Sequence, residues 1–311
     1  MASTQQIKAR IKSVKNTKQI TKAMELVAAS KMRRAQEATL ASRDYTITAH
    51  DILSRLRQLT DVSAHPLFTK RDVKSRIIIV ITSDRGLAGA YNSNVLRQLT
   101  KELQQDKINK VDTKLILIGK QAAKFAARIA EVQVIGSYDH MPERPTVADL
   151  QAILSTVKDA FVGLSKSMLT LEELENDLEA AQLKLAPTVD AVDLLFTNYK
   201  SSVLQVVTQS RLLPAAYEVA ETTENHSEAI FEPSPKVVLN NIADKLVDVQ
   251  MWQAYLESQA SEQSSRMMAM KTASDNAGDL IDDLTLAANS ARQAAITQEL
   301  AEITGGAEAM K

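Results

Sequence analysis

The first 65 residues of the chain contain neither proline nor glycine, and this absence constrains the fold more than any other feature. Pro66 is the first proline and Gly86 the first glycine. A second run extends from Lys236 to about Thr304, interrupted only by Gly278. At 1.5 Å per residue, each run predicts a helix of roughly 90–100 Å, about three times the diameter of a small domain. Helices of this length must pair with each other, project into a partner, or do both.

Composition excludes several classes of protein. The chain has 311 residues, enough for roughly one to three domains. It has no cysteine, which excludes disulfides, thiol nucleophiles and cysteine-based metal sites. A net charge of -1 gives no signal for nucleic-acid binding, and no apolar run approaches the ~20 residues that span a bilayer. Aromatic residues make up only 4%, which favours helix over an all-β fold.

Charge is segregated between the two ends of the chain. Residues 1–36 contain nine basic residues and one acidic residue, Glu25. Residues 272–308 contain seven acidic residues and one basic residue, Arg292. The end segments are therefore electrostatically complementary, although exposed pairs contribute only about tenths of a kcal/mol each. The basic segment lacks interleaved aromatic residues, so an acidic protein surface, including the chain's own acidic end, is favoured over nucleic acid or membrane.

The amino-terminal segment also invites comparison with a mitochondrial presequence, because it is basic and amphipathic. It is rich in lysine rather than arginine, however, and its periodicity continues without a break that resembles a cleavage site. We also expect no secretory signal. We therefore expect a bacterial protein on the cytoplasmic side of the membrane.

Apolar periodicity predicts that the two long helices form a left-handed coiled coil, and they run antiparallel if the segment between them sits at one end of the shaft. In the carboxyl-terminal run, steps of four and three residues keep an almost continuous apolar seam, broken only by Gln253, Gln263 and Ser274. The seam comprises Ile242, Leu246, Val249, Gln253, Leu256, Ala260, Gln263, Met267, Met270, Ser274, Ala277, Ile281, Leu284, Ala288, Ala291 and Ala295. The first helix is expected to start its seam at Ile7, Ile11 and Val14, shift to Ile20, Met24 and Val27, and resume with Tyr45, Ala49, Ile52, Leu56 and Leu59.

Between the two long runs, the sequence pattern changes and predicts alternating strands and helices. Continuous β-branched and apolar runs predict buried parallel strands, so we expect a Rossmann-like α/β domain. Strands are expected at 76–82, 114–119, 132–135, 191–199 and 203–208, and helices at 90–105, 120–130, 146–162 and 170–185, with a loop at 221–235. The predicted division is a shaft helix at 1–65, a central domain at 66–235 with a helical insertion at about 165–187, and a second shaft helix at 236–311.

No residue pattern indicates catalysis, a cofactor or a metal. The turn at 83–89 follows a strand and precedes a helix, as phosphate-binding turns do, but its glycine spacing fits neither G-x-G-x-x-G nor a P-loop. A structural or partner-contacting turn is favoured. The four histidines, His50, His65, His140 and His226, lack metal-ligand spacing, and no carboxylate pair stands out as an acid and base.

Four strings resemble signatures of the gamma subunit of F-type ATP synthase. They are ITKAMELVAASKM at 20–32, TSDRGLAGAYN at 82–92, SEQSSRMMAMK at 261–271 and SARQAAITQEL at 290–300, the last followed by Glu302 and Ile303. The strings are highly specific and occur in the same order as in that family, and the resemblance extends over essentially the whole chain. It implies an antiparallel coiled coil joined to an α/β domain.

The resemblance also implies a non-catalytic rotor. One copy would stand inside a ring of three alpha and three beta subunits, with its α/β domain on the membrane ring of c subunits beside the epsilon subunit. Proton or sodium flow would turn the c ring, and this chain would couple that rotation to ATP synthesis or hydrolysis and so regulate ATPase activity and ion flow. The expected location is peripheral, at the cytoplasmic face of the bacterial cell membrane. Neither a cofactor nor nucleic-acid binding nor bilayer insertion is implied.

Partner contacts are implied at particular positions. Arg266, Arg292, Gln293, Thr297 and Glu299 resemble positions that hydrogen-bond or ion-pair with the catch loops of beta, and Met24 and Ala88 resemble positions near its acidic lever. Phe231 and Glu232 resemble the foot segment that touches the c ring and epsilon. One departure is the segment from Ser165 to Pro187, which is longer than in compact bacterial members. It is expected to be inert or modestly regulatory, and without cysteine it holds no thiol switch.

Two other functions remain open from the residues. A free-standing coiled-coil scaffold with an α/β head predicts a stable homo-oligomer without an ATPase ring. A nucleotide-binding enzyme that uses the turn at 83–89 predicts ATP or NAD binding that Gly86→Ala abolishes. The sequence leaves open the coupling ion, the size of the c ring, the organism and the preferred direction of rotation.

Overall fold

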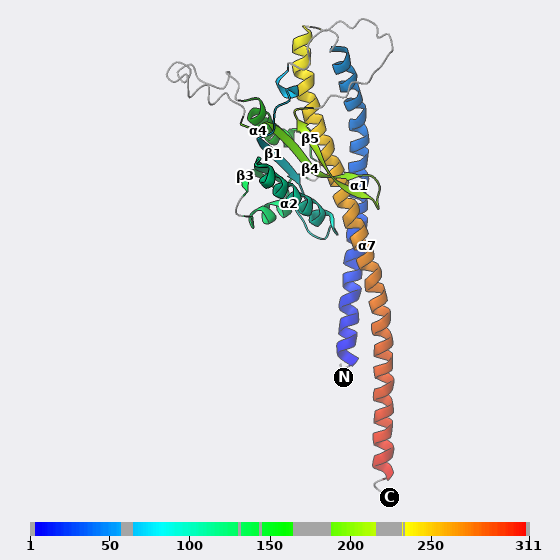
Figure 1. Ribbon diagram of the computed structural model, residues 1–311. Coiled ribbons are helices and arrows are strands. Elements are labelled where there is room, and N and C mark those ends of the chain that lie inside the picture. Colours follow the sequence, from blue (N-terminus) through cyan, green and yellow to red (C-terminus); the bar gives the residue numbers. More distant parts are fainter. Residues whose placement is uncertain are drawn as a thin grey trace. The chain divides into compact units, whose positions relative to one another are not determined.

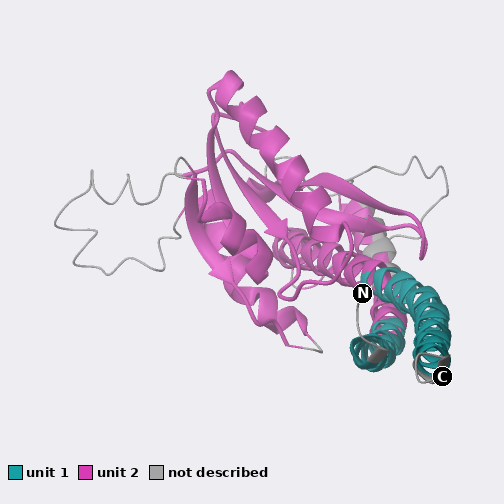
Figure 2. Cartoon of the chain, turned by 90° about the horizontal axis from the view of Figure 1, so that it is seen from below, with its two compact units in different colours: residues 1–30, 266–311 teal, residues 31–265 magenta. Residues whose placement is uncertain are grey.

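The computed structural model describes residues 4–56, 65–129, 132–142, 145–163, 188–215, 232 and 234–308 (Figure 1). The chain divides into two compact units: unit 1 comprises residues 1–30 and 266–311, and unit 2 comprises residues 31–265 (Figure 2). The helix expected at 170–185 and most of the loop expected at 221–235 lie outside the described residues. The predicted division into two shaft segments and a central domain stays a prediction.

Two long helices confirm the expectation from the runs without proline. Helix α1 spans Thr4–Leu56 and helix α7 spans Pro235–Glu308. A proline suits the first position of α7, because no N–H is needed there and the fixed φ is helical. The Ser234 hydroxyl accepts a hydrogen bond from the Val237 N–H at 3.4 Å and so caps this end. Gly278 does not end the helix, since an isolated glycine costs only about 1 kcal/mol.

Within unit 1, burial along α7 follows the predicted seam. Met270, Ser274, Ala277 and Ala288 are buried, and the intervening seam positions are half-buried. The seam ends near Ala291, and every described position from 292 to 305 is exposed. The two helices pack closely and run antiparallel (Figure 1): a Cβ at Gly278 of α7 would lie 2.8 Å from the Nζ of Lys18 on α1.

The seam predicted for α1 is wrong between residues 20 and 27. Ile20 and Val27 are 61% and 55% exposed, and Met24 is half-buried, whereas Thr21 and Ala28 are 9% and 1% exposed. The heptad spacing of Ile7, Ile11 and Val14 continues without a shift and places the smaller side chains of Thr21 and Ala28 at the seam. Their size suits the small residues on the facing part of α7, because close helix approach leaves little volume at the seam.

In unit 2, a five-stranded sheet has the order β3-β2-β1-β4-β5. The strands are β1 (Ser75–Ile81), β2 (Asp112–Ile118), β3 (Gln133–Tyr138), β4 (Ala191–Tyr199) and β5 (Gln205–Leu213). The first four are parallel, as predicted. The last was expected at 203–208, but it begins later, continues to Leu213 and runs antiparallel to β4. The short link explains this direction, because a parallel connection needs a crossover of about a dozen residues or more.

Helices cover both faces of the sheet. On one face lie α2 (Tyr91–Asn109) and α3 (Lys120–Ala126), packed through one apolar cluster. On the other face, a larger cluster joins α4 (Gln151–Val162), the end of α1, the part of α7 in unit 2, and the short helices η2 (Pro66–Phe68) and η3 (Val147–Leu150). This two-sided cover explains why β1, the second half of β2 and most of β4 are buried without alternation.

Candidate functional site

The turn between β1 and α2 is held by hydrogen bonds from within the protein. Ser83 N donates to Asn92 Oδ1 at 3.0 Å, and Lys120 N donates to Asp84 Oδ1 at 3.1 Å. A phosphate group would need such backbone donors free and would face the Asp84 carboxylate. The geometry therefore favours a structural or partner-contacting turn over a nucleotide site.

The tip of this turn presents one large apolar side chain. Leu87 is 64% exposed and its backbone has a φ of 63°, a left-handed conformation that non-glycine residues adopt uncommonly. The next residue, Ala88, is only 2% exposed. Its carbonyl oxygen accepts a hydrogen bond from Ser265 Oγ of α7 at 2.7 Å. The turn is therefore fixed to α7 through Ala88, and Leu87 faces solvent.

A row of serines on α7 extends this contact along the carboxyl ends of β1 and β4. Tyr91 Oη lies 2.7 Å from Ser258 Oγ, Ser261 Oγ donates to Thr197 O at 3.0 Å, and Ser264 Oγ donates to Ser202 O at 2.9 Å. In open α/β sheets, ligands bind outside the carboxyl ends where the strand order reverses, which here is between β1 and β4. The serine face of α7 occupies this position.

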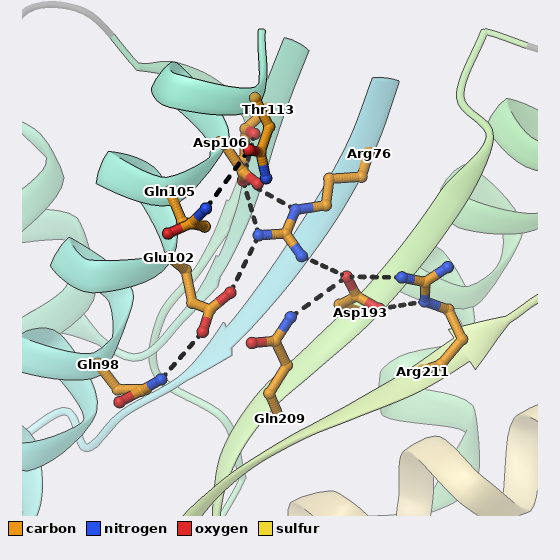
Figure 3. Close-up of polar contacts among 10 residues, drawn as sticks. Arg76, Gln98, Glu102, Gln105, Asp106, Thr113, Asp193, Gln209 and Arg211 are labelled. Carbon is orange, nitrogen blue, oxygen red and sulfur yellow. Dashed lines mark hydrogen bonds and ion pairs between the residues drawn. The ribbon is translucent and has the colours of Figure 1, made fainter. Parts of the chain in front are cut away.

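A buried ionic cluster lies on the face of the sheet that α2 covers (Figure 3). At its centre is Arg76 of β1, which is 7% exposed. Its guanidinium contacts Asp106 of α2 at 2.7 Å, Asp193 of β4 at 2.8 Å and Glu102 of α2 at 3.1 Å. Arg211 of β5 also pairs with Asp193. The cluster thus connects three strands and one helix.

Electrostatics keep Arg76 charged. Burial alone would lower the pKa of its guanidinium, but hydrogen bonds to Asp106 and Glu102 and the charge of Asp193 outweigh burial and raise the pKa. Sequence reasoning missed this cluster. The available signal was a charged residue in each of two otherwise apolar strands, Arg76 and Asp193, since such residues are seldom buried unless they are paired.

The residues with implied partner contacts differ in exposure. In unit 1, Arg266 is 8% exposed and Met24 is half-buried. Four others lie on the fully exposed end of α7: Arg292, Gln293, Thr297 and Glu299. The structure brings two of these together, since Thr297 Oγ1 donates to the Gln293 carbonyl at 2.9 Å. Ala88 and Glu232 belong to unit 2, where Ala88 is buried and Glu232 is exposed, and Phe231 lies outside the described residues.

Unit 1 also exposes large apolar side chains away from its seam. On α1 these include Ile20, Leu26 and Val27, and on α7 they include Leu286, Ile296, Leu300 and Ile303, all between 49% and 69% exposed. Apolar exposure repeated along two helices indicates contact with other proteins. None of the described helices is long and apolar enough to cross a membrane. Within the described parts of the chain, no three histidine, aspartate or glutamate side chains gather into a possible metal site.

The described residues thus define an α/β protein with two long, paired terminal helices. Its sequence matches the ATP synthase family over residues 3–310. It is 34% identical to the ATP synthase gamma chain of Legionella pneumophila (strain Corby), and 37% identical to those of Heliobacterium modesticaldum and Ralstonia nicotianae. Each alignment covers all of both chains. The chain belongs to the family of gamma subunits of F-type ATP synthase.

Solved structures agree with this assignment. The central stalk and c-ring structure of the Tetrahymena thermophila mitochondrial ATP synthase contains a chain with a TM-score of 0.59 and 25% identity. That alignment covers 82% of this chain and 99% of the other. A chain in the Euglena gracilis mitochondrial ATP synthase, with 16% identity and a TM-score of 0.62, shares the fold over 99% of this chain and 94% of its own length.

Proposed function

We propose that this chain is the central-stalk rotor of a bacterial F-type ATP synthase, and that it carries no catalytic residue of its own. It couples rotation of the c ring to ATP synthesis and hydrolysis at the beta subunits, and thereby regulates ATPase activity and ion flow. The observation that carries this proposal is the full-length match to gamma chains. The exposed apolar residues of unit 1 support it, because a rotor of this kind must contact the surrounding subunits over much of its length.

The proposed complex contains one copy of this chain with three alpha and three beta subunits, an epsilon subunit and a ring of c subunits. The coupling ion is a proton or sodium. The chain would be peripheral, on the cytoplasmic face of the membrane. The Tetrahymena structure, which comprises a central stalk and a c ring, supports the contact with the membrane ring. Glu232, exposed in unit 2, is a proposed foot residue with Phe231.

Contacts with beta are proposed at both units. Arg292, Gln293, Thr297 and Glu299 are exposed and therefore available to the catch loops. Met24 and Arg266 are further contact residues of unit 1, each with little exposed surface. In unit 2, Ala88 is proposed to act through the shape of its turn, because its own side chain is buried. Leu87, next to it, offers the exposed apolar surface.

Reconstitution tests the proposal directly. The chain would be mixed with the alpha and beta subunits of the same genome, and ATP hydrolysis would be compared with that of a preparation without gamma. A large gain in steady turnover, with one copy of this chain per ring, is the expected result. No association and no gain would contradict the proposal and favour a separate scaffold role.

A matched pair of variants assigns the contact to the end of α7. The double substitution Gln293→Ala and Thr297→Ala should weaken assembly or turnover, because both side chains are exposed there and no packing within unit 1 depends on them. The control is Thr285→Ala with Asn289→Ala, which changes two exposed residues at the same spacing on the same helix. Equal effects of the two pairs would count against a specific contact at Gln293 and Thr297.

A further inference from the structure

Helices α2 and α3 carry positive charge on their outward side. Both helices pack on the same face of the sheet, and they contact each other. Val95 and Leu99 of α2, with Ala122 of α3, point inward and are buried. Because a helix turns 100° per residue, positions two residues away from an inward residue point outward. Four basic residues occupy such positions: Arg97 and Lys101 on α2, and Lys120 and Lys124 on α3. Lys120 is half-buried and the other three are exposed.

The acidic residues of these helices do not balance this charge. Glu102 and Asp106 are the only carboxylates within α2 and α3, and both bind Arg76 in the ionic cluster. Asp84, in the turn before α2, is half-buried and accepts the Lys120 backbone N–H, so its charge lies at the first turn of α3. Neither helix has an acidic residue in its first turn, where negative charge is ordinarily favourable. Within α2 and α3 themselves, the charged residues at these outward positions are therefore all basic.

The spacing of the basic residues makes this arrangement unfavourable in the isolated chain. Arg97 and Lys101 are four residues apart, and so are Lys120 and Lys124, so each pair lies on one helix face. Arg128 follows at the same interval. Like charges at this spacing destabilise a helix, whereas opposite charges stabilise it by a similar amount. A surface that only needed to be soluble would mix the two signs, so the repeated repulsion indicates a partner that supplies the missing negative charge.

We infer that this basic face, formed by Arg97, Lys101, Lys120 and Lys124, is a docking surface for an acidic surface of another protein. Charge complementarity carries the inference. A protein partner is favoured over a lipid bilayer because surface binding to a bilayer also needs buried apolar side chains. The described outward positions of α2 offer one, Ile108, at the far end of the helix, and those of α3 offer none. The inference goes beyond the rotor function, which assigns no role to this face.

Photo-crosslinking within the purified ATP synthase complex tests the inference. The reporter p-benzoylphenylalanine replaces Gln104, an exposed, uncharged residue three positions after Lys101 on α2. The expected product joins α2 to a peptide of another subunit that is rich in aspartate and glutamate. A control reporter at Ser155, exposed on α4 on the opposite face of the sheet, should not give that product.

Charge reversal shows whether the cations cause the contact. The fourfold variant Arg97→Glu, Lys101→Glu, Lys120→Glu and Lys124→Glu should lower the yield of the acidic crosslink by at least about tenfold, since four attractions become repulsions. Raising the salt concentration should lower it too, because exposed charges are screened. A yield that is insensitive to both changes would overturn the inference. So would a lipid adduct, which would assign the face to the membrane, or an intact complex without any crosslink from Gln104.

A single reversal separates docking from a structural role. In the isolated chain, Lys101→Glu replaces a repulsive pair with an attractive one, so its unfolding midpoint should stay the same or rise. In the complex, the same variant should reduce the acidic crosslink. A fall in both quantities would mean that Lys101 supports the fold instead. The crosslinking test rests on the proposed function, because it needs the complex; failure of the chain to copurify with alpha and beta would contradict that function, not the docking surface.

Discussion

Replacing Arg76 with methionine tests how strongly the ionic cluster holds unit 2 together. Methionine keeps an unbranched side chain of moderate length and removes the positive charge. Asp106, Asp193 and Glu102 would then lose their shared cation, with side chains that are 7%, 2% and 20% exposed. Arg211 would still neutralise Asp193. Among the described residues, the hydroxyl of Thr113 would remain to donate a hydrogen bond to the Asp106 carboxylate, at 2.7 Å.

The expected loss of stability depends on how well each carboxylate is still neutralised or solvated after Arg76 is removed. Removing one partner of a buried ion pair costs about 3–5 kcal/mol, because it leaves an uncompensated buried charge. Since Asp193 keeps Arg211 and Glu102 is partly exposed, the lower end of that range is expected, about 3 kcal/mol. Adding Asp106→Asn to Arg76→Met should cost less than the two single losses together. Coupling of roughly 0.5–3 kcal/mol is typical for residues in one network.

Urea unfolding of the full chain at pH 7 measures these losses through tryptophan fluorescence. Trp252, the only tryptophan, is half-buried on the part of α7 that packs against the larger apolar cluster of unit 2. Its signal therefore follows unit 2. The matched control is Lys70→Met, which removes an exposed positive charge and should change the free energy of unfolding by no more than about 0.5 kcal/mol.

Two results would refute this reasoning. A loss below about 1 kcal/mol for Arg76→Met would mean that water or a rearranged Arg211 replaces the missing cation at little cost. Simple additivity of Arg76→Met and Asp106→Asn would mean that the two residues act independently, despite their 2.7 Å contact. Either result would remove the cluster from the interactions that determine the stability of unit 2.

Three further predictions use the same fluorescence measurement. Gly119→Ala should lose at least about 2 kcal/mol, because φ is +94° and the new Cβ would lie 2.3 Å from a backbone oxygen, whereas Gly86→Ala, with nothing within 4 Å, should change stability by about 0.5 kcal/mol or less. Tyr91→Phe should cost about 1–3 kcal/mol, since it leaves the buried Ser258 hydroxyl without this partner; an unchanged midpoint would contradict the contact. Burial lowers the pKa of His65 from its ordinary 6.5, and its Nδ1 accepts a backbone N–H, so the folded state favours neutral imidazole. The stabilisation that comes from the neutral imidazole is fully present above pH 6.5 and is lost as pH falls through the lower pKa of the folded state. When pH is lowered from about 7.5 to about 5, the free energy of unfolding of the His65→Asn variant should therefore fall less than that of the wild type.

The long helices and the parallel strands could be predicted because their signals are local. Absence of proline and glycine over long runs leaves little alternative to helix, and the continuous apolar run Ile77–Ile81 fits a strand covered on both faces. The end of β5 could not be predicted in this way. Gln209 and Arg211 look unlike a buried strand, but their side chains reach the ionic cluster (Figure 3), so a tertiary contact overrides the local pattern.

The seam of α1 shows a second limit of sequence patterns. An apolar pattern favours large side chains and therefore predicts Ile20 and Val27 at the seam, yet the structure buries Thr21 and Ala28. In a closely packed helix pair, small residues face the partner helix, and large apolar residues remain for surfaces outside the pair. The same ambiguity affects the ionic cluster: Arg76 is conspicuous in its strand, but its partners on α2 depend on how that helix is rotated over the sheet.

In open α/β sheets, the crevice at the point where the strand order reverses ordinarily binds a ligand, and in this chain a helix lies there. The crevice between the carboxyl ends of β1 and β4 exposes backbone carbonyls that need hydrogen-bond donors. In this chain, Ser261 and Ser265 of α7 supply two of them, to Thr197 O and Ala88 O. Helix α7 thus lies where a nucleotide would bind in such sheets. The turn at 83–89, which could have held a phosphate, is instead hydrogen-bonded to α7 through Ala88. An α/β sheet of this kind therefore gives no reason to expect chemistry, because function depends on what occupies the site rather than on the fold.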